Sequence, residues 1–117
     1  GIIGDVKGAT CIMLDDIIDT GGTLIAGSDA LLKAGAKSVY AAATHGVLTS
    51  GAPERLQESN FKEIVITDTI YLDPTKKVPK IKQLSIGNLL GEAIIHILND
   101  EPISQIFDKI EEDQEWN

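Results

Sequence analysis

Short apolar runs along the chain predict the strands of a parallel sheet. Residues 9–14 (ATCIML) are almost continuously apolar and include β-branched side chains. Such a run is typical of a strand that is buried on both faces. Residues 38–43 (SVYAAA) and 63–67 (EIVIT) repeat the pattern, and residues 82–85 predict a short fourth strand.

The segments between and after these runs have helical spacing. Residues 23–33 place apolar side chains seven positions apart on one face, and Gly35 supplies a stop. Residues 53–59 predict a short helix that proline opens at its first turn, and residues 86–98 return to helical spacing. Strands that alternate with helices predict an α/β fold, a three-layer sandwich whose mainly parallel sheet is covered on both faces.

Two segments outside these elements are strongly charged. Residues 73–82 carry two prolines and four lysines, which in an acidic protein predict a solvated loop and not an anion-binding patch. The four lysines are Lys76, Lys77, Lys80 and Lys82. Residues 109–117 form an acidic end that we expect to be frayed or solvated. The chain has no methionine at its start and soon enters a strand, which indicates a piece of a longer protein.

Composition excludes several classes of protein. With 117 residues, 43% of them hydrophobic, the chain can bury one core of ordinary size. A formal charge of −8 and a single arginine argue against a nucleic-acid binder, which needs clustered basic residues. No apolar segment approaches the ~20 residues that cross a bilayer, and the start GIIGDVKG does not have the basic-then-apolar pattern of a signal peptide, so we expect a cytoplasmic protein without membrane contact. Cys11, the one cysteine, is expected to be a small buried hydrophobe.

The most informative stretch is IMLDDIIDTGGT at residues 12–23, where three carboxylates within five residues precede glycine and hydroxyl residues. Glycines permit a tight turn, the helix start presents N–H groups to an anion, and Thr20 and Thr23 add hydroxyl donors. This half of the stretch predicts a phosphate loop. The fingerprints of nucleotide sites are absent, because Ser28 and Asp29 stand where a P-loop requires Lys and Ser or Thr.

Carboxylates beside a phosphate would repel it unless they face a different part of the ligand. In open parallel sheets, ligands bind outside the carboxyl ends of the strands, where we expect Asp15 and Asp16 to fall. A sugar phosphate reconciles the two halves: its phosphate would sit on residues 20–23 and its hydroxyls would donate to Asp15 and Asp19, with a divalent cation nearby. The predicted binding residues are Asp15, Asp16, Asp19, Thr20, Gly21, Gly22 and Thr23.

Two other interpretations of the stretch remain open on the sequence. Asp15, Asp16 and Asp19 have the D-D-x-x-D spacing of the metal-diphosphate cluster in isoprenyl diphosphate synthases, which are all-helical and much larger. Alternatively, the three acids only cap the following helix and decorate a turn.

The same stretch resembles the phosphoribosyl diphosphate binding motif shared by type I phosphoribosyltransferases and ribose-phosphate pyrophosphokinases, two acidic residues after a hydrophobic strand and then D-T-G-G-T. Six further segments resemble, in order, the C-terminal part of the second family. They are residues 4–8 (GDVKG), 34–41 (AGAKSVYA), 44–48 (THGVL), 67–70 (TDTI), 84–86 (LSI) and 103–108 (ISQIFD). The resemblance implies a phosphoribosyltransferase-like fold, with residues 1–108 a C-terminal portion of such a domain and residues 109–117 an acidic tail.

The resemblance also implies an activity. Enzymes of this family transfer the diphosphoryl group of ATP to the C1 hydroxyl of ribose 5-phosphate with Mg²⁺, giving phosphoribosyl diphosphate and AMP. Carried over by position, Asp15 and Asp19 would hold the ribose hydroxyls, Asp16 would support the site, and residues 20–23 would bind the 5-phosphate. The metal ligands are left open, with Asp15 a candidate that acts through the bound ligand. Catalysis would come from positioning and charge compensation.

Other family features lie outside this chain. The ATP pocket, a metal-binding histidine and aspartate, and a mobile loop with catalytic lysine and arginine lie upstream in the family, and none of Lys7, Lys33 or Lys37 matches that loop. We therefore expect no catalytic residue here, and binding of ribose phosphate without turnover. Alternative functions are a non-catalytic regulatory homologue that binds phosphoribosyl diphosphate, or another type I phosphoribosyltransferase.

Regulation and assembly are implied by resemblance alone. Family members form hexamers and place an allosteric phosphate or ADP site between subunits. Ser104 and Phe107 match residues of that site, whereas Pro102 stands where some members have serine. We expect His45 to be structural and His96 to be a core or rim residue of its helix.

Overall fold

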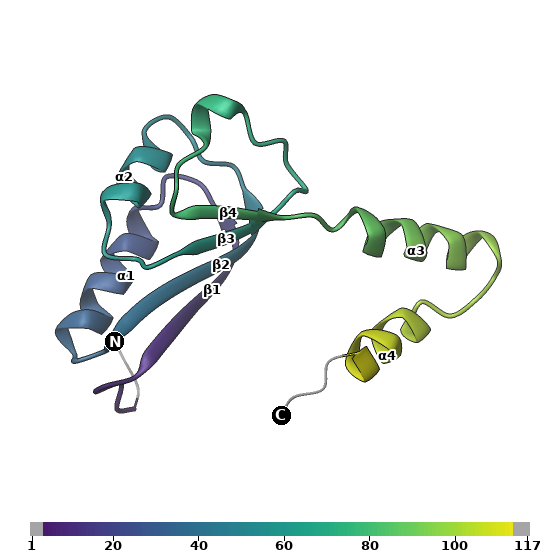
Figure 1. Ribbon diagram of the computed structural model, residues 1–117, viewed down its shortest axis with the longest axis horizontal. Coiled ribbons are helices and arrows are strands. Elements are labelled where there is room, and N and C mark those ends of the chain that lie inside the picture. Colours follow the sequence, from purple (N-terminus) through teal and green to yellow (C-terminus); the bar gives the residue numbers. More distant parts are fainter. Residues whose placement is uncertain (1–3, 114–117) are drawn as a thin grey trace. The chain divides into compact units, whose positions relative to one another are not determined.

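A four-stranded parallel sheet organises the first of two units, which meet between Leu84 and Ser85. The computed structural model describes residues 4–113. The strands lie in chain order, and each neighbouring pair is parallel (Figure 1). They are β1 (Thr10–Ile18), β2 (Ser38–Gly46), β3 (Ile64–Thr67) and β4 (Ile81–Leu84). The predicted α/β class and the parallel sheet are confirmed.

Helices α1 (Gly22–Lys33) and α2 (Ala52–Glu58) connect successive strands and cover one face of the sheet (Figure 1). Right-handed crossovers between strands that follow one another in a single direction place both helices on the same side. Leu24 of α1 and Leu56 of α2 are buried in one core with strand residues such as Val39 and Ile64. The core therefore lies between the sheet and its two helices.

The opposite face of this sheet is open, which corrects the expectation that residues 9–14 are buried on both faces. Side chains alternate along a strand. Cys11 and Met13 pack against the core, whereas Ile12 is 66% exposed and Leu14 is 79% exposed. Of the predicted three-layer sandwich, the first unit contains two layers, the sheet and the helices α1 and α2.

Strand β1 is longer than its apolar run. It pairs with β2 as far as Ile18, with Asp15 opposite Ala43 and Ile17 opposite His45. Asp15 and Asp16 therefore belong to the strand and do not follow it, because backbone pairing with β2 continues through the polar positions. A strand also excludes the helix-borne carboxylates of the isoprenyl diphosphate synthase interpretation.

The lysine-rich segment is less solvated than its composition predicts. It contains a short 3-10 helix, η1 (Pro74–Lys76). Lys76 Nζ donates to the Val47 carbonyl at 3.2 Å, Lys80 Nζ donates to the Ser59 carbonyl at 2.5 Å, and both side chains are half-buried. These two lysines tie the segment to the core unit, whereas Lys77 and Lys82 are exposed as expected.

The second unit contains two helices, α3 (Gly87–Leu98) and α4 (Ser104–Asp113). Helix α3 has the predicted bounds to within one residue, but most of its apolar residues are exposed. They are Leu90, Ile94, Ile95, Ile97 and Leu98. Helix α4 was not predicted, and the expected domain limit at residue 108 falls inside it. Residues 109–113 are helical and not frayed, and residues 114–117 of the predicted acidic tail lie outside the described part of the chain.

His96 ties α3 to the segment that connects it to α4. Its Nδ1 lies 3.3 Å from the Pro102 carbonyl and 3.6 Å from the Glu101 carboxylate. The histidine is half-buried and so lies at the rim of its helix pair. Within residues 4–113, no helix is long and apolar enough to span a bilayer.

Candidate functional site

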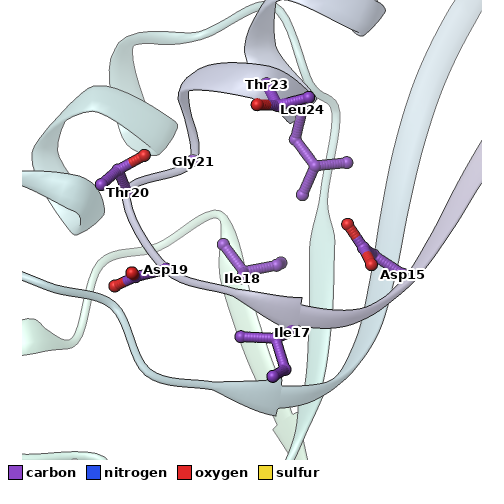
Figure 2. A pocket seen from close by; sticks show the side chains of 8 residues that line it. All are labelled: Asp15, Ile17, Ile18, Asp19, Thr20, Gly21, Thr23 and Leu24. Atoms are coloured by element: carbon purple, nitrogen blue, oxygen red, sulfur yellow. The ribbon is translucent and has the colours of Figure 1, made fainter.

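A small cleft lies where β1 ends and α1 begins. Its volume is about 220 Å³, and residues of the β1 end, the following loop and the first turn of α1 surround it (Figure 2). The lining residues are Asp15, Ile17, Ile18, Asp19, Thr20, Gly21, Thr23 and Leu24. The cleft therefore coincides with the stretch that the sequence singles out.

The loop turns at Gly21, and only glycine suits this position. Gly21 is buried and has φ 81°, a left-handed conformation that costs other residues about 1–2 kcal/mol. A Cβ at this position would lie 3.1 Å from Leu56 Cδ2, in contact with a fully buried side chain of α2. The loop is thus packed directly on α2.

Hydrogen bonds hold the loop while leaving donors at the start of α1. The Gly22 N–H donates to Thr20 Oγ1 at 3.3 Å, and the Ile25 N–H donates to the Gly21 carbonyl at 2.9 Å. The first N–H groups of a helix have no partner within it. No side chain caps α1. The interpretation in which the acids cap this helix is therefore wrong.

The three carboxylates do not act alike. Asp15 and Asp19 line the cleft, and Figure 2 shows them on its two sides, whereas Asp16 is not among the lining residues. The pKa of Asp16 lies below its ordinary value, chiefly because its carboxylate shares a hydrogen bond with the Asp15 side chain. The N–H groups of Asp16 and Ile17 and the nearby His45 ring lower this pKa further. Asp16 is thus held as an anion beside the cleft.

The ends of the neighbouring strands carry a small polar network. His45 Nδ1 lies 2.6 Å from Thr69 Oγ1, and Thr67 Oγ1 donates to the Thr44 carbonyl at 2.5 Å. These bonds tie the end of β2 to the end of β3 and the segment that follows it. They are consistent with the structural role expected for His45.

Five of the seven predicted binding residues line the cleft, and Gly22 begins α1 beside it. The five are Asp15, Asp19, Thr20, Gly21 and Thr23. Ser104 and Phe107 lie on α4 in the second unit, where both are exposed. The apolar lining residues Ile17, Ile18 and Leu24 were not predicted as site residues, although they lie within the motif or directly after it in the sequence.

The site contains no cation of its own. Neither lysine, arginine nor histidine lines the cleft. Over residues 4–113, no group of three or more His, Cys, Asp or Glu could hold a metal ion. A larger hollow of about 410 Å³ on the open face of the sheet is lined mostly by apolar side chains, such as Leu14, Val65 and Leu84. The smaller cleft is therefore the better candidate for a polar anion.

Comparison with known proteins identifies the class to which this fold and cleft belong. Residues 1–108 match the family described as "Phosphoribosyl synthetase-associated domain". Since the match extends over most of the chain, the chain belongs to this family. The proteins that the chain resembles within it are ribose-phosphate pyrophosphokinases, and the resemblance is to their C-terminal portion.

Two relatives show what share of a ribose-phosphate pyrophosphokinase the chain matches. The chain is 50% identical over 107 residues to ribose-phosphate pyrophosphokinase 1 of Streptococcus pneumoniae serotype 4, covering 92% of this chain and 33% of the relative. It is 54% identical over 106 residues to the enzyme of Caldanaerobacter subterraneus subsp. tengcongensis, covering 91% and 34%. The chain thus spans about a third of the length of these relatives.

A solved structure confirms the architecture. The crystal structure of phosphoribosylpyrophosphate synthetase from Mycobacterium smegmatis superposes with a TM-score of 0.81 at 45% sequence identity. The match covers 84% of this chain and 33% of that chain. The fold is therefore that of part of this synthetase.

Proposed function

We propose that the chain is the ribose 5-phosphate-binding portion of a ribose-phosphate diphosphokinase. The complete enzyme would transfer the diphosphoryl group of ATP to the C1 hydroxyl of ribose 5-phosphate, giving phosphoribosyl diphosphate and AMP. The observation that carries the proposal is the cleft itself, which brings two carboxylates together with the start of a helix.

The start of α1 would take the 5-phosphate. Thr20, Gly21 and Thr23 line the cleft at this point, and Gly22 opens the helix. Helix N-terminal N–H groups and the helix dipole favour an anion, and the two hydroxyls can donate to phosphate oxygens. The first turn of α1 contains no acidic residue, so no carboxylate of that turn competes with a bound anion.

The carboxylates would take the sugar. Asp15 and Asp19 can accept hydrogen bonds from ribose hydroxyls, and a bond to an ionised acceptor is stronger than a neutral one. Holding the ribose at both ends would orient its C1 hydroxyl for in-line attack on ATP, which is catalysis by positioning. Asp16 would support the site from outside the cleft.

Magnesium would bind with the ligand and not in a protein cage. Mg²⁺ usually keeps several waters and is held by one or two carboxylates together with substrate phosphates. Asp15 and Asp19 fit that limited donor set, and the described residues provide no larger one. The ion would supply charge compensation at the transferred diphosphoryl group. The family's homo-hexamer, cytoplasmic location and allosteric site with Ser104 and Phe107 stay predictions.

Calorimetry with ribose 5-phosphate tests this assignment on the 117-residue chain. Asp15→Ala and Asp19→Ala should each weaken binding about 10- to 100-fold, because each removes a charged acceptor worth ~1.5–3 kcal/mol. Glu58→Ala, an exposed acid at the end of α2, is the matched control and should bind like wild type. Circular dichroism should show an unchanged fold. Equal affinity in all four proteins, or no binding by wild type, would overturn the assignment.

A further inference from the structure

Arg55 of α2 is the one arginine of the chain, and it contacts the candidate phosphate loop from outside the cleft. Its Nη2 donates to the Thr20 carbonyl at 2.8 Å, across 35 positions of sequence. No ion pair of Arg55 with a carboxylate is recorded within residues 4–113, although the chain is acidic. The guanidinium therefore donates to a backbone carbonyl and does not pair with a carboxylate.

The direction of that bond has a consequence for the next N–H group. A trans peptide points its carbonyl and its N–H to opposite sides, and no cis peptide occurs in the described part of the chain. Since Arg55 fixes the Thr20 carbonyl on the side of α2, the N–H of Gly21 points away from α2. Gly21 lines the cleft, so this N–H is directed toward the space that an anion would occupy.

The neighbouring contacts leave the loop little freedom to turn this peptide over. Leu56, next to Arg55 on α2, lies against Gly21. The Gly21 carbonyl accepts from the Ile25 N–H at 2.9 Å. This bond fixes the Gly21–Gly22 peptide with its carbonyl directed into α1. The Thr20–Gly21 peptide is thus held by two contacts, the packing of Leu56 against Gly21 and the hydrogen bond from Arg55 to the Thr20 carbonyl.

We propose that Arg55 is a positioning residue for ligand binding, which orients the Thr20–Gly21 peptide so that its N–H faces the bound phosphate. The inference rests on the proposed function for the identity of the ligand, but the orientation of the loop can be measured without any ligand. Arginine suits this role because its planar guanidinium presents donors in a fixed geometry, whereas a lysine ammonium is a point charge on a flexible stem.

A simpler role for Arg55 is its charge at the end of a short helix. Cations near a helix C-terminus are favourable because of the helix dipole, and Arg55 lies in the last turn of α2. Lysine would serve that purpose equally well. Arg55→Lys therefore separates the two roles, since it keeps the charge and loses the fixed donor geometry.

The test uses the 117-residue chain with Arg55→Ala, Arg55→Lys and, as a matched loss of one positive charge, Lys62→Ala. Lys62 is exposed two residues before β3, and its backbone N–H donates to the Val39 carbonyl. Without ligand, hydrogen exchange at the N–H groups of Gly22 and Ile25, which are bonded within the turn, should accelerate about tenfold in both Arg55 variants and stay unchanged in Lys62→Ala. Calorimetry should show affinity for ribose 5-phosphate falling about tenfold in the same two variants.

The outcomes separate the two proposals. Wild-type exchange in Arg55→Lys, or in both Arg55 variants, would overturn the positioning role. Faster loop exchange in both Arg55 variants, together with no ribose 5-phosphate binding by wild type, would support the positioning role and overturn the proposed ligand.

Discussion

Helices α1 and α2 begin with almost the same backbone geometry. Gly21 before α1 has φ 81° and ψ −6°, and Gly51 before α2 has φ 82° and ψ −10°. Neither helix has a side-chain cap. The first turns differ, because α2 contains Pro53, which has no N–H, and Glu54, whose charge compensates the helix dipole. The turn is therefore a shared structural solution, and the residues that follow it decide whether an anion can bind.

The two helices also differ in length and in how they contact the loop at Gly21. Helix α1 extends over 12 residues and α2 over seven. Helix α2 provides Leu56 against Gly21 and Arg55 to the Thr20 carbonyl. One helix thus presents the candidate binding turn while the other supports it from behind.

The largest expected effect comes from replacing the two turning glycines. Gly21→Ala should destabilise the fold by at least ~1–2 kcal/mol, because it adds left-handed strain and crowds Leu56 at 3.1 Å. It should also reduce ribose 5-phosphate affinity more than a hundredfold, since the loop must move off α2. Urea unfolding and calorimetry measure the two quantities.

Gly51→Ala is the matched partner of that change. It adds the same left-handed strain, and its Cβ would lie 2.7 Å from Arg55 Nη1. We expect a similar loss of stability but only about a tenfold loss of affinity, as for Arg55→Ala. Equal loss of affinity in both glycine variants would show that the two turns do not differ in the way described.

A smaller effect should separate the hydroxyl groups beside the two turns. Thr23 lines the cleft, whereas Thr49 lines a separate hollow at the start of α2. Thr23→Val keeps the shape and removes one donor, so affinity for ribose 5-phosphate should fall about three- to tenfold, the worth of a neutral hydrogen bond. Thr49→Val should leave affinity unchanged. Titration by calorimetry decides this, and an equal loss in both variants would contradict the assignment of the phosphate to α1.

The smallest effect concerns acid stability near the hollow of α2. Asp73 accepts from the Thr75 hydroxyl at 2.7 Å and the Thr75 N–H at 2.9 Å, and these bonds hold the pKa of Asp73 below 3.8. Because the folded pKa is the lower one, this stabilisation is complete above pH 3.8 and is lost as the pH falls through the folded value. Urea midpoints at pH 6 and pH 3 should therefore differ less in Asp73→Asn than in wild type.

The pKa of Asp16 is also lowered in the folded protein, so part of the pH dependence of stability should persist in Asp73→Asn. Glu58→Gln, which removes an exposed carboxylate on α2, is the control and should retain the wild-type difference. An undiminished difference in Asp73→Asn would contradict the role of the Thr75 bonds.

Much of the fold was predictable because local patterns and tertiary contacts agree. Helices α1 and α3 and strand β3 lie within a residue of their expected bounds. Strand β1 extends beyond its expected end, since the polar Asp15 and Asp16 stay paired with β2 despite their unfavourable strand propensity. Helix α4 was missed because its strongly polar composition resembled a solvated tail.

The candidate site was predictable where the motif is continuous and not where it depends on folding. The cleft residues from Asp15 to Thr23 are neighbours in sequence. Arg55 reaches Thr20 only because α2 packs against the loop, and no spacing rule links positions 35 apart. Likewise, the carbonyl partners of Lys76 and Lys80 lie on distant segments, so composition alone assigned both lysines to solvent.

The hydrogen bond from Arg55 also makes the loop chemically addressable. A dicarbonyl reagent that is selective for arginine has a single target among the 117 residues, and that target is an exposed guanidinium behind the turn at Gly21. One adduct of known mass would therefore mark one position. Because the adduct forms on the guanidinium itself, it would remove the bond to the Thr20 carbonyl and so test the role of Arg55 without replacing any residue that lines the cleft.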